Sequence, residues 1–508
     1  MSETREPKAP YTFGDYRRAQ GFSIGGIPLR RMSLAGALGL CTILSFNFSM
    51  KLAAVMLVTT ALVSMVFVIP WGARKSTMYE WVRYYARGKW RISRGVTDLV
   101  SGPLTQFERR NRLPGVLAPL VPVTVSDGAG GEQVVLHNRA TGIISAIARC
   151  APVGTALADR DDADSWVANY GSLLASLGYR QMVESLAITI DSAPSGGSTQ
   201  EDYVRDRMND HRDWSPTFAQ AVMEDLVTTN PAVSADVTTT VTVNFDPAKM
   251  NPKPATMEQA VGEALRWMPS IENGLSSAGA TVIGRAQLPW LVRRLRMAFD
   301  PAARREATRQ LEVGADDAEV LAWSDGGAMR ALEEWKYYQH DSGVSHSWVM
   351  DAPPTGSVQH SILIPLLAPG PYPRRVSLVY HPLGAADAKK VVEKEISAGT
   401  LRTLIAAKTK KDVTQRDIED RRRALRAASA EAQGAGVGTF TMYVTTTVDD
   451  ESELAAAIAD VENRAGQCKL TLREAHGAEA AVFGCSLGLG IDPTRELTKK
   501  PGTRWEPK

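Results

Sequence analysis

The sequence is poor in the residues that form disulfides and metal sites. Its 508 residues include four cysteines, at positions 41, 150, 468 and 485, and none of them forms a CxxC or another zinc-ligand spacing. Thiols this few and scattered do not make a disulfide framework, and they fit a reducing compartment. The seven histidines are also isolated from one another, so we expect no metal site and no metal cofactor.

Motifs for nucleotide chemistry are absent as well. The P-loop pattern G-x-x-x-x-G-K-[ST] has no match, and the one Gly-Lys pair, Gly88-Lys89, lacks the upstream glycine and the hydroxyl residue. Residues 434–438 (GAGVG) resemble part of a dinucleotide loop. They precede an expected strand, however, whereas the dinucleotide fingerprint follows one. We interpret 434–438 as a turn and expect no cofactor.

One catalytic pattern does occur near the C-terminus. Residues 484–488 (GCSLG) match the G-x-S-x-G nucleophile elbow, in which Ser486 would be the nucleophile. That elbow needs a helix after it and a histidine further along, but a polar tail follows and no histidine lies after His476. A membrane-tethered serine hydrolase remains an alternative. We expect that the protein is not an enzyme and has no catalytic residues.

The sequence does contain one long hydrophobic run. From Met32 to Ala73 the only strongly polar residues are Asn47 and Lys51. A bilayer core needs about twenty apolar residues per helix, so the run is long enough for two spans with the polar pair at the turn. It is too long for a cleaved signal peptide. One tilted or re-entrant helix is the remaining alternative.

The charge pattern predicts the orientation of this hairpin. Residues 1–112 carry a net charge of about +11 and residues 113–508 about −9. Lys and Arg flank the run on both sides, and such residues are retained on the cytoplasmic side. We therefore expect a multi-pass protein of the inner membrane whose N-terminus and large domain are both cytoplasmic. The aromatic and basic stretch at 74–94 suits an amphipathic helix on the headgroups.

The remainder predicts two α+β units. Residues 237–246 alternate apolar residues with threonines, which is typical of a half-buried strand, and a helix near 257–268 and a strand at 281–286 should follow. The same order recurs at 439–448, 454–461 and 469–475. Strands at 183–190 and 376–380, each with a long helical segment behind it, precede the two copies. Each unit is therefore expected to resemble a ferredoxin-like or split β-α-β sheet with helices on one face.

The predicted fold class is α+β, and the chain is divided into seven segments. They are a cytoplasmic N-terminal tail (1–31), a transmembrane hairpin (32–73), a basic juxtamembrane segment and linker (74–132), a first α+β unit (133–300), a connecting segment (301–375), a second α+β unit (376–490) with a charged helical insertion (385–432), and a polar C-terminal tail (491–508).

Two charged segments could in principle bind anions. The insertion contains Arg421, Arg422 and Arg423, which could contact the phosphates of nucleic acid or lipid. Acidic residues are interleaved with them, and this pattern favours a solvated helix. Residues 288–300 (LPWLVRRLRMAFD) likewise predict an amphipathic helix, with its leucines and Phe299 facing a core.

Several of these segments together resemble a known family. The hairpin at 32–73, the segment LPWLVRRLRMAFDP (288–301), the strand RRVSLVYHPL (374–383) and the stretch 439–490 are similar to membrane-anchored components of actinobacterial conjugation systems of the type IV secretion class. In that family a PrgI-like hairpin is joined to a domain similar to the N-terminal, non-motor half of the TrbE-type secretion ATPase. The resemblance implies a non-enzymatic inner-membrane scaffold.

The same resemblance implies the partners. These would be membrane lipids, other secretion or conjugation subunits including a separate motor ATPase, and further copies of the chain packed through sheet edges. A second resemblance is to the EccE-type structural subunit of type VII secretion, which also joins two N-terminal spans to an α+β domain. The charged insertion at 385–432 favours the conjugation family.

Overall fold

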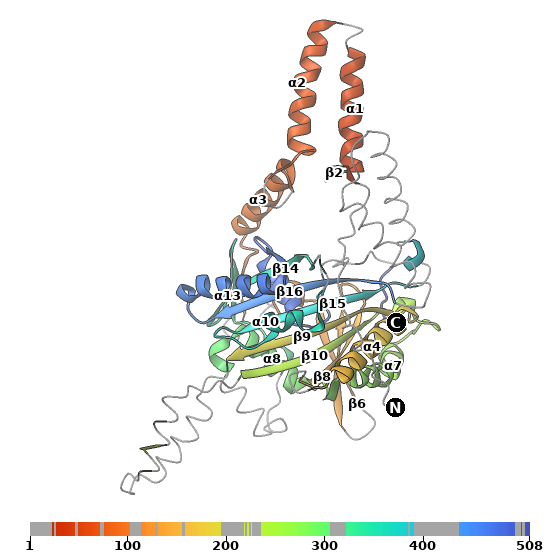
Figure 1. The fold of residues 1–508 in the computed structure, drawn as a ribbon, viewed down its shortest axis with the longest axis vertical. Coiled ribbons are helices and arrows are strands. Elements are labelled where there is room, and N and C mark those ends of the chain that lie inside the picture. Colours follow the sequence, from red (N-terminus) through yellow and green to blue (C-terminus); the bar gives the residue numbers. More distant parts are fainter. Residues whose placement is uncertain are drawn as a thin grey trace, which may run out of the picture. The chain divides into compact units, whose positions relative to one another are not determined.

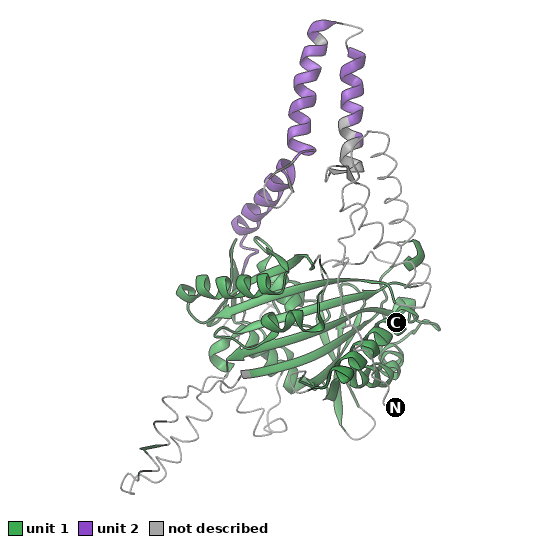
Figure 2. Cartoon of the chain, viewed as in Figure 1, with its two compact units in different colours: residues 1–15, 99–391, 427–508 green, residues 16–98, 392–426 purple. Residues whose placement is uncertain are grey.

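The computed structural model describes most of the chain in separate segments. These are residues 23–24, 27–45, 49–71, 76–101, 113–126, 131–154, 158–194, 218, 221–222, 225, 235–304, 322–354, 356, 358–384, 387–390, 436–492, 499 and 503–507. The described residues fall into two compact units (Figure 2). Unit 1 lies within 99–391 and 427–508, and unit 2 lies within 16–98.

Unit 2 is mainly helical. Its elements are β1 (Ser23–Ile24), β2 (Ile27–Pro28), α1 (Leu29–Ser45), α2 (Met50–Phe67), β3 (Pro70–Trp71), β4 (Ser76–Thr77) and α3 (Met78–Ser93). Helices α1 and α2 lie side by side as a hairpin (Figure 1). Within the described residues, no helix combines the length and the hydropathy that crossing a bilayer requires.

Unit 1 is built on one large antiparallel sheet. In the part of the chain that the structure describes, the sheet has thirteen strands in the order β5-β12-β13-β14-β16-β15-β9-β10-β8-β7-β6, with β11 beside β8 and β17 beside β14. Five of these strands are β5 (Asp98–Val100), β6 (Leu120–Ser126), β7 (Glu132–Asn138), β12 (Arg330–Glu333) and β13 (Tyr338–His340). The other eight belong to two segments that have the same order of elements.

Two segments of unit 1 have the same order of elements. The first contains β8 (Ile144–Pro152), α4 (Arg160–Gly178), β9 (Val183–Pro194), β10 (Ala235–Phe245), α7 (Met257–Ser277) and β11 (Ala280–Arg285). The second contains β14 (Gly343–Ala352), α10 (Ile364–Leu367), β15 (Arg374–Pro382), β16 (Gly438–Val448), α13 (Leu454–Gln467) and β17 (Thr471–Glu474). Their strands lie in the corresponding orders β11-β8-β10-β9 and β17-β14-β16-β15. Both have the element order β-α-β-β-α-β.

The two segments are joined edge to edge through β9 and β15. These strands pair antiparallel from Arg374 opposite Ser192 to Tyr380 opposite Leu186, and we call this pairing the seam. Each is the second strand of its own segment. Because two equivalent strands pair antiparallel, the two segments are related by an approximate two-fold rotation about the seam. The middle pair of the register is Ser377 with Thr189.

Helices cover both faces of this sheet. One face packs against α4 and α7 and, in the second segment, against α10 and α13. The opposite face packs against α8 (Leu288–Phe299) and α14 (Glu479–Ser486), whose Leu291, Phe299 and Phe483 belong to the largest hydrophobic cluster. The expectation that helices cover one face only is therefore wrong.

The threonine face of β10 shows why that expectation was wrong. Thr240 and Thr242 alternate with apolar residues as predicted, but both are fully buried. Thr242 Oγ1 donates to the Gly488 carbonyl at 2.5 Å, and Thr240 Oγ1 accepts from Arg294 at 2.9 Å. Since a buried hydroxyl costs little once it is hydrogen-bonded, a strand can alternate threonine with valine and still have both faces covered.

Three of the expected boundaries need correction. The basic juxtamembrane segment and linker at 74–132 contains α3, where a helix was expected, and also the strand β6. The connecting segment at 301–375 contains β14, the first strand of the second segment. The described residues of the predicted polar tail at 491–508 also pack on the domain. Trp505 is buried beside His137, with ring centroids 5.9 Å apart, and its indole N–H donates to the Pro254 carbonyl at 2.9 Å. Lys499 also contacts the domain, since its side chain donates to the Asp246 carboxylate at 2.6 Å.

Several expectations concern residues outside the described ones. The N-terminal tail at 1–31 is described only in part, and the insertion at 385–432, with Arg421, Arg422 and Arg423, is described only at 387–390. The helical segment expected after the strand at 183–190 lies almost wholly outside the described residues. These remain predictions.

Candidate functional site

The hairpin of unit 2 places a group of hydroxyl side chains between its helices and most of its large apolar side chains outside, although Thr59 is exposed and donates to carbonyls of its own helix. Between α1 and α2, the hydroxyl oxygens of Thr42 and Thr60 lie 2.8 Å apart, and the Ser45 hydroxyl donates to the Thr42 carbonyl at 2.6 Å. Large apolar side chains project outward instead, and those more than half exposed are Leu40, Ile43, Leu44, Met50, Val55, Leu57, Val58 and Leu62. This distribution is the reverse of that in a water-soluble helical hairpin.

Helix α3 follows the hairpin and the short strands β3 and β4 in unit 2. A capping box begins it, because Thr77 Oγ1 accepts from the Glu80 amide and the Glu80 carboxylate accepts from the Thr77 amide. The Phe67 and Tyr79 rings lie 4.9 Å apart between α2 and α3. None of the residues of α3 is buried, although it includes Trp81, Tyr84, Tyr85 and Trp90.

A buried charged cluster in unit 1 lies beside the seam. Arg375 of β15 donates from Nε to Asp191 of β9 at 3.2 Å, and Arg304 bridges Asp191 and Asp236 at 3.5 and 3.3 Å. Burial alone would raise the pKa of the Asp191 carboxyl, but Arg375, Arg304 and Arg294 together hold that pKa well below its ordinary value. Asp191 is therefore ionised in the folded protein.

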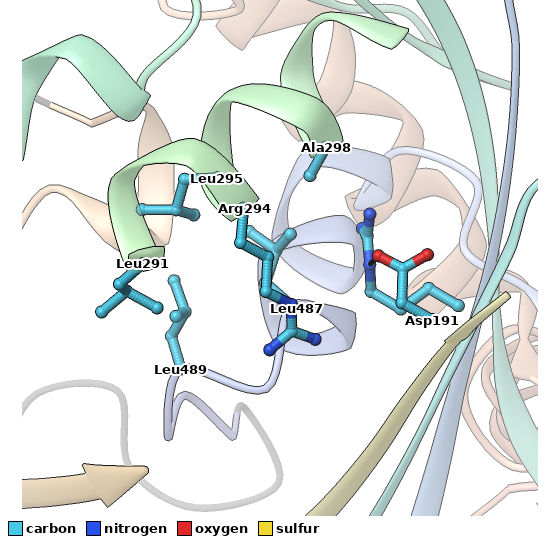
Figure 3. Close-up of a pocket in the computed structure, with 8 residues that line it drawn as sticks. Asp191, Leu291, Arg294, Leu295, Ala298, Leu487 and Leu489 are labelled. Carbon is cyan, nitrogen blue, oxygen red and sulfur yellow. Dashed lines mark hydrogen bonds and ion pairs between the residues drawn. The ribbon is translucent and has the colours of Figure 1, made fainter. Parts of the chain in front are cut away.

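Arg294 of α8 completes the charged cluster. Its guanidinium is buried, with Nη1 donating to Thr240, and it lies 5.6 Å from the Trp290 ring centroid. Burial lowers the pKa of this guanidinium to about 10, and Asp191 opposes the shift. Figure 3 shows apolar side chains of α8 and of the segment after α14, Leu291, Leu295, Leu487 and Leu489, around the cluster.

The cavity in this cluster is too small for a substrate. It holds about 10 Å³, which is room for roughly one water molecule. Sequence reasoning correctly placed Leu291, Leu295 and Phe299 in the core, but it missed that Arg294 and Arg375 also turn inward. The structure thus brings Arg294 and Arg375, one from each of the segments 288–301 and 374–383, to the Asp191 carboxylate, and the Arg375–Asp191 ion pair links β15 to β9.

A larger polar cavity lies near one end of the seam. It holds about 340 Å³, and His381, Asp492, Glu184 and Lys499 are among its lining residues. His381 Nε2 pairs with the Asp492 carboxylate, which also accepts from the Tyr443 hydroxyl at 2.5 Å. The second ring nitrogen, Nδ1, contacts the Glu184 carbonyl at 3.1 Å. Both nitrogens of His381 are therefore engaged within the protein, and no sequence motif pointed to this cavity.

The serine of the G-x-S-x-G pattern is not placed as a nucleophile. Ser486 is the last residue of α14, is fully buried, and donates its hydroxyl to the Phe483 carbonyl at 2.8 Å. Gly488 has φ +70°, and a β-carbon there would lie 2.3 Å from Thr189 Oγ1. The second glycine of the pattern is thus explained by the turn after the helix and by close backbone packing.

The other candidate groups give no further site in the part of the chain that the structure describes. No group of three or more His, Cys, Asp or Glu side chains there could hold a metal ion. All four cysteines are free, with Cys41 exposed and the others buried. Neither the comparison with protein-family models nor that with curated proteins returned a match.

Proposed function

We propose that this protein is a non-enzymatic scaffold subunit of a conjugation or type IV secretion-like machine. In this proposal α1 and α2 form a transmembrane hairpin in the inner membrane, the N-terminus and unit 1 are cytoplasmic, and the domain docks a separate motor ATPase. The observation that carries it is the reversed hairpin, in which Thr42 and Thr60 are hydrogen-bonded between the helices while leucine, isoleucine and valine project outward.

A bilayer accounts for that reversal. Hydrocarbon offers no partner for a hydroxyl group, so Thr42 and Thr60 pair between the helices and Thr59 donates to carbonyls of its own helix. Hydrocarbon accepts apolar side chains at no cost. At 1.5 Å per residue the helices are about 26 Å long, against a hydrocarbon core of about 30 Å. In unit 1 the distribution is the ordinary one, since α7 buries Met268, Ile271 and Leu275.

The scaffold role is supported by what the larger unit offers. The charged cluster has room for about one water, Ser486 is buried, and both nitrogens of His381 are engaged. The domain instead offers a broad, rigid sheet with two similar segments. We propose that these two segments arose by duplication and that each has the ferredoxin-like fold.

Membrane extraction and co-purification test the proposal. The full chain should remain in the membrane pellet after carbonate treatment, and a variant with Leu57 and Leu62 both changed to Asp should not. After mild solubilisation, a P-loop ATPase of the same gene cluster should co-purify with the wild-type chain. Recovery in the carbonate supernatant would contradict the anchor, and recovery from intact membranes without any ATPase would contradict the docking role.

Two alternatives predict different results. An EccE-like subunit of a type VII translocon would co-purify with other subunits of that system instead of a conjugation ATPase. A membrane-tethered serine hydrolase would be labelled by a serine-reactive phosphonate, and the Ser486→Ala variant would lose the label. The burial of the Ser486 hydroxyl argues against labelling.

A further inference from the structure

Helix α3 presents two different faces. Trp81 and Tyr85 are one turn apart, and their rings stack with centroids 5.7 Å apart and planes 1° from parallel. Arg83 and Arg87 are also one turn apart, and both are exposed. At 100° per residue, the arginine pair lies roughly 160° around the helix from the aromatic pair. One side of the helix therefore carries the stacked aromatic pair and the opposite side carries the arginine pair, together with Trp90, whose ring lies 5.1 Å from the Arg94 guanidinium.

The charged residues of α3 are almost all positive. Between Met78 and Arg94 there are five basic residues and one acidic residue, Glu80. That carboxylate belongs to the capping box at the start of the helix. The remaining charges of the helix are therefore all positive, and an anionic partner would complement them.

We infer that α3 lies in the headgroup layer of the cytoplasmic leaflet and binds anionic phospholipids. This inference rests on the proposed membrane anchor. Trp81 and Tyr85 enter the boundary of the acyl chains, and Arg83 and Arg87 bind lipid phosphates from the opposite side of the helix. Arginine suits this role because its planar guanidinium can bind a phosphate through two parallel hydrogen bonds.

The two opposite faces favour a lipid over the other anionic partners. A nucleic acid or an acidic protein would cover the side that carries the arginine pair and leave Trp81 and Tyr85 in water. A helix half-immersed in a bilayer has acyl chains below it and phosphates around its upper side, so both faces are matched at once. The attachment of α3 to the end of α2 through Phe67 and Tyr79 holds it at that depth.

Tryptophan quenching by brominated lipids tests the inference with the full chain in proteoliposomes. Either phosphatidylglycerol or phosphatidylcholine carries the bromine, at the same mole fraction. The tryptophan fluorescence of α3 is the difference between the fluorescence of the wild type and that of the Trp81→Phe/Trp90→Phe variant. We expect brominated phosphatidylglycerol to quench this fluorescence more strongly, and the preference to fall on the order of fivefold for each engaged arginine that is removed in Arg83→Gln/Arg87→Gln.

The matched control removes two positive charges from unit 1, at Lys253 and Arg266, which are exposed. Lys253→Gln/Arg266→Gln should keep the full preference, and 1 M salt should abolish it in the wild type because the Debye length falls to about 3 Å. Equal quenching by the two lipids, or no quenching of Trp81 and Trp90, would overturn the inference. Failure of the protein to float with either kind of vesicle would instead overturn the anchor.

Discussion

The hydroxyl oxygens of Thr189 and Ser377 lie 2.8 Å apart at the middle of the seam between the two segments of the sheet. Both side chains are fully buried, and they come from corresponding strands, β9 and β15. Because the seam relates the segments by an approximate two-fold rotation, these two residues lie next to its axis. The join between the segments is thus made by a hydrogen bond between side chains as well as by the backbone ladder.

We expect the Thr189→Val variant to lower the free energy of unfolding by about 1–3 kcal/mol, because the Ser377 hydroxyl would be left buried without its partner. The double variant Thr189→Val/Ser377→Ala should cost less than the sum of the single changes, since no hydroxyl is then left unpaired. Urea unfolding of the four proteins in detergent gives the coupling energy. Strict additivity would show that the pair does not couple the segments.

Loss of the Asp191 carboxylate should be far more damaging. In Asp191→Asn the guanidinium groups of Arg375, Arg304 and Arg294 keep only Asp236 as a counter-charge, and removal of one partner from a buried ion pair costs about 3–5 kcal/mol. The control is Asp387→Asn, whose ion pair with Lys390 is mostly exposed and should contribute at most about 0.5 kcal/mol. Comparable losses in the two variants would contradict the structural role of the charged cluster.

Acid should weaken the same cluster. The arginines hold the pKa of Asp191 below its ordinary value of 3.8, so its contribution to stability is present above that pH and is lost as the pH falls towards the folded-state pKa. The wild type should therefore lose stability below about pH 4 more steeply than Asp191→Asn does. Thermal unfolding followed from pH 6 to pH 3 measures the difference.

The Glu479 carboxyl of α14 should titrate in the opposite sense. Burial raises its pKa from 4.5 to about 9, although the Ser347 amide donates to it. The native state therefore holds the proton, and the stability it contributes is complete below pH 4.5 and declines as the pH rises to about 9. We expect Glu479→Gln to flatten this decline, which is at most about 1.4 kcal/mol per pH unit. An unchanged slope between pH 6 and pH 9 would refute the assignment.

The glycine after α14 should not tolerate a side chain. Gly488→Ala would combine a positive φ with a β-carbon 2.3 Å from Thr189 Oγ1, so we expect a loss of several kcal/mol in thermal or urea unfolding. Gly466→Ala, in α13, serves as the control because nothing lies within 4 Å of its β-carbon position. There, alanine should keep or raise stability by up to about 1 kcal/mol. Equal behaviour of the two variants would argue against the close packing of Gly488 on Thr189.

The sequence patterns predicted the repeated elements well, because apolar periodicity reports directly on strands and helices. Alternation in 237–246 and 439–448 located β10 and β16, and the order of elements around them located β9, α7 and α13. The same patterns could not show which polar residues turn inward. Thr240, Arg294 and Arg375 are residue types that usually lie on the surface. Their hydrogen-bond partners, which offset the cost of burying them, come from segments that are distant in the sequence.

The charged cluster and the polar cavity were unpredictable for a related reason. Asp191 and Arg375 are far apart in the sequence and meet only because β9 and β15 pair at the seam. His381 and Asp492 meet because the segment after α14 returns across the sheet, and nothing in the sequence of the expected tail indicates that return. Contacts of this kind depend on topology, and local propensity carries no information about them.

The seam also sets the two positions at which the chain leaves the sheet after β9 and after β15. Residues 195–234 follow β9 and residues 383–437 follow β15, each between the second and third strands of its segment. Because β9 and β15 run antiparallel, these two exits lie at opposite ends of the paired strands, with Pro194 at one end and Pro382 at the other. At about 3.4 Å per residue, the exits are separated by roughly 30 Å along the strands. A partner that contacts the chain at both exits therefore has to span the length of the paired strands.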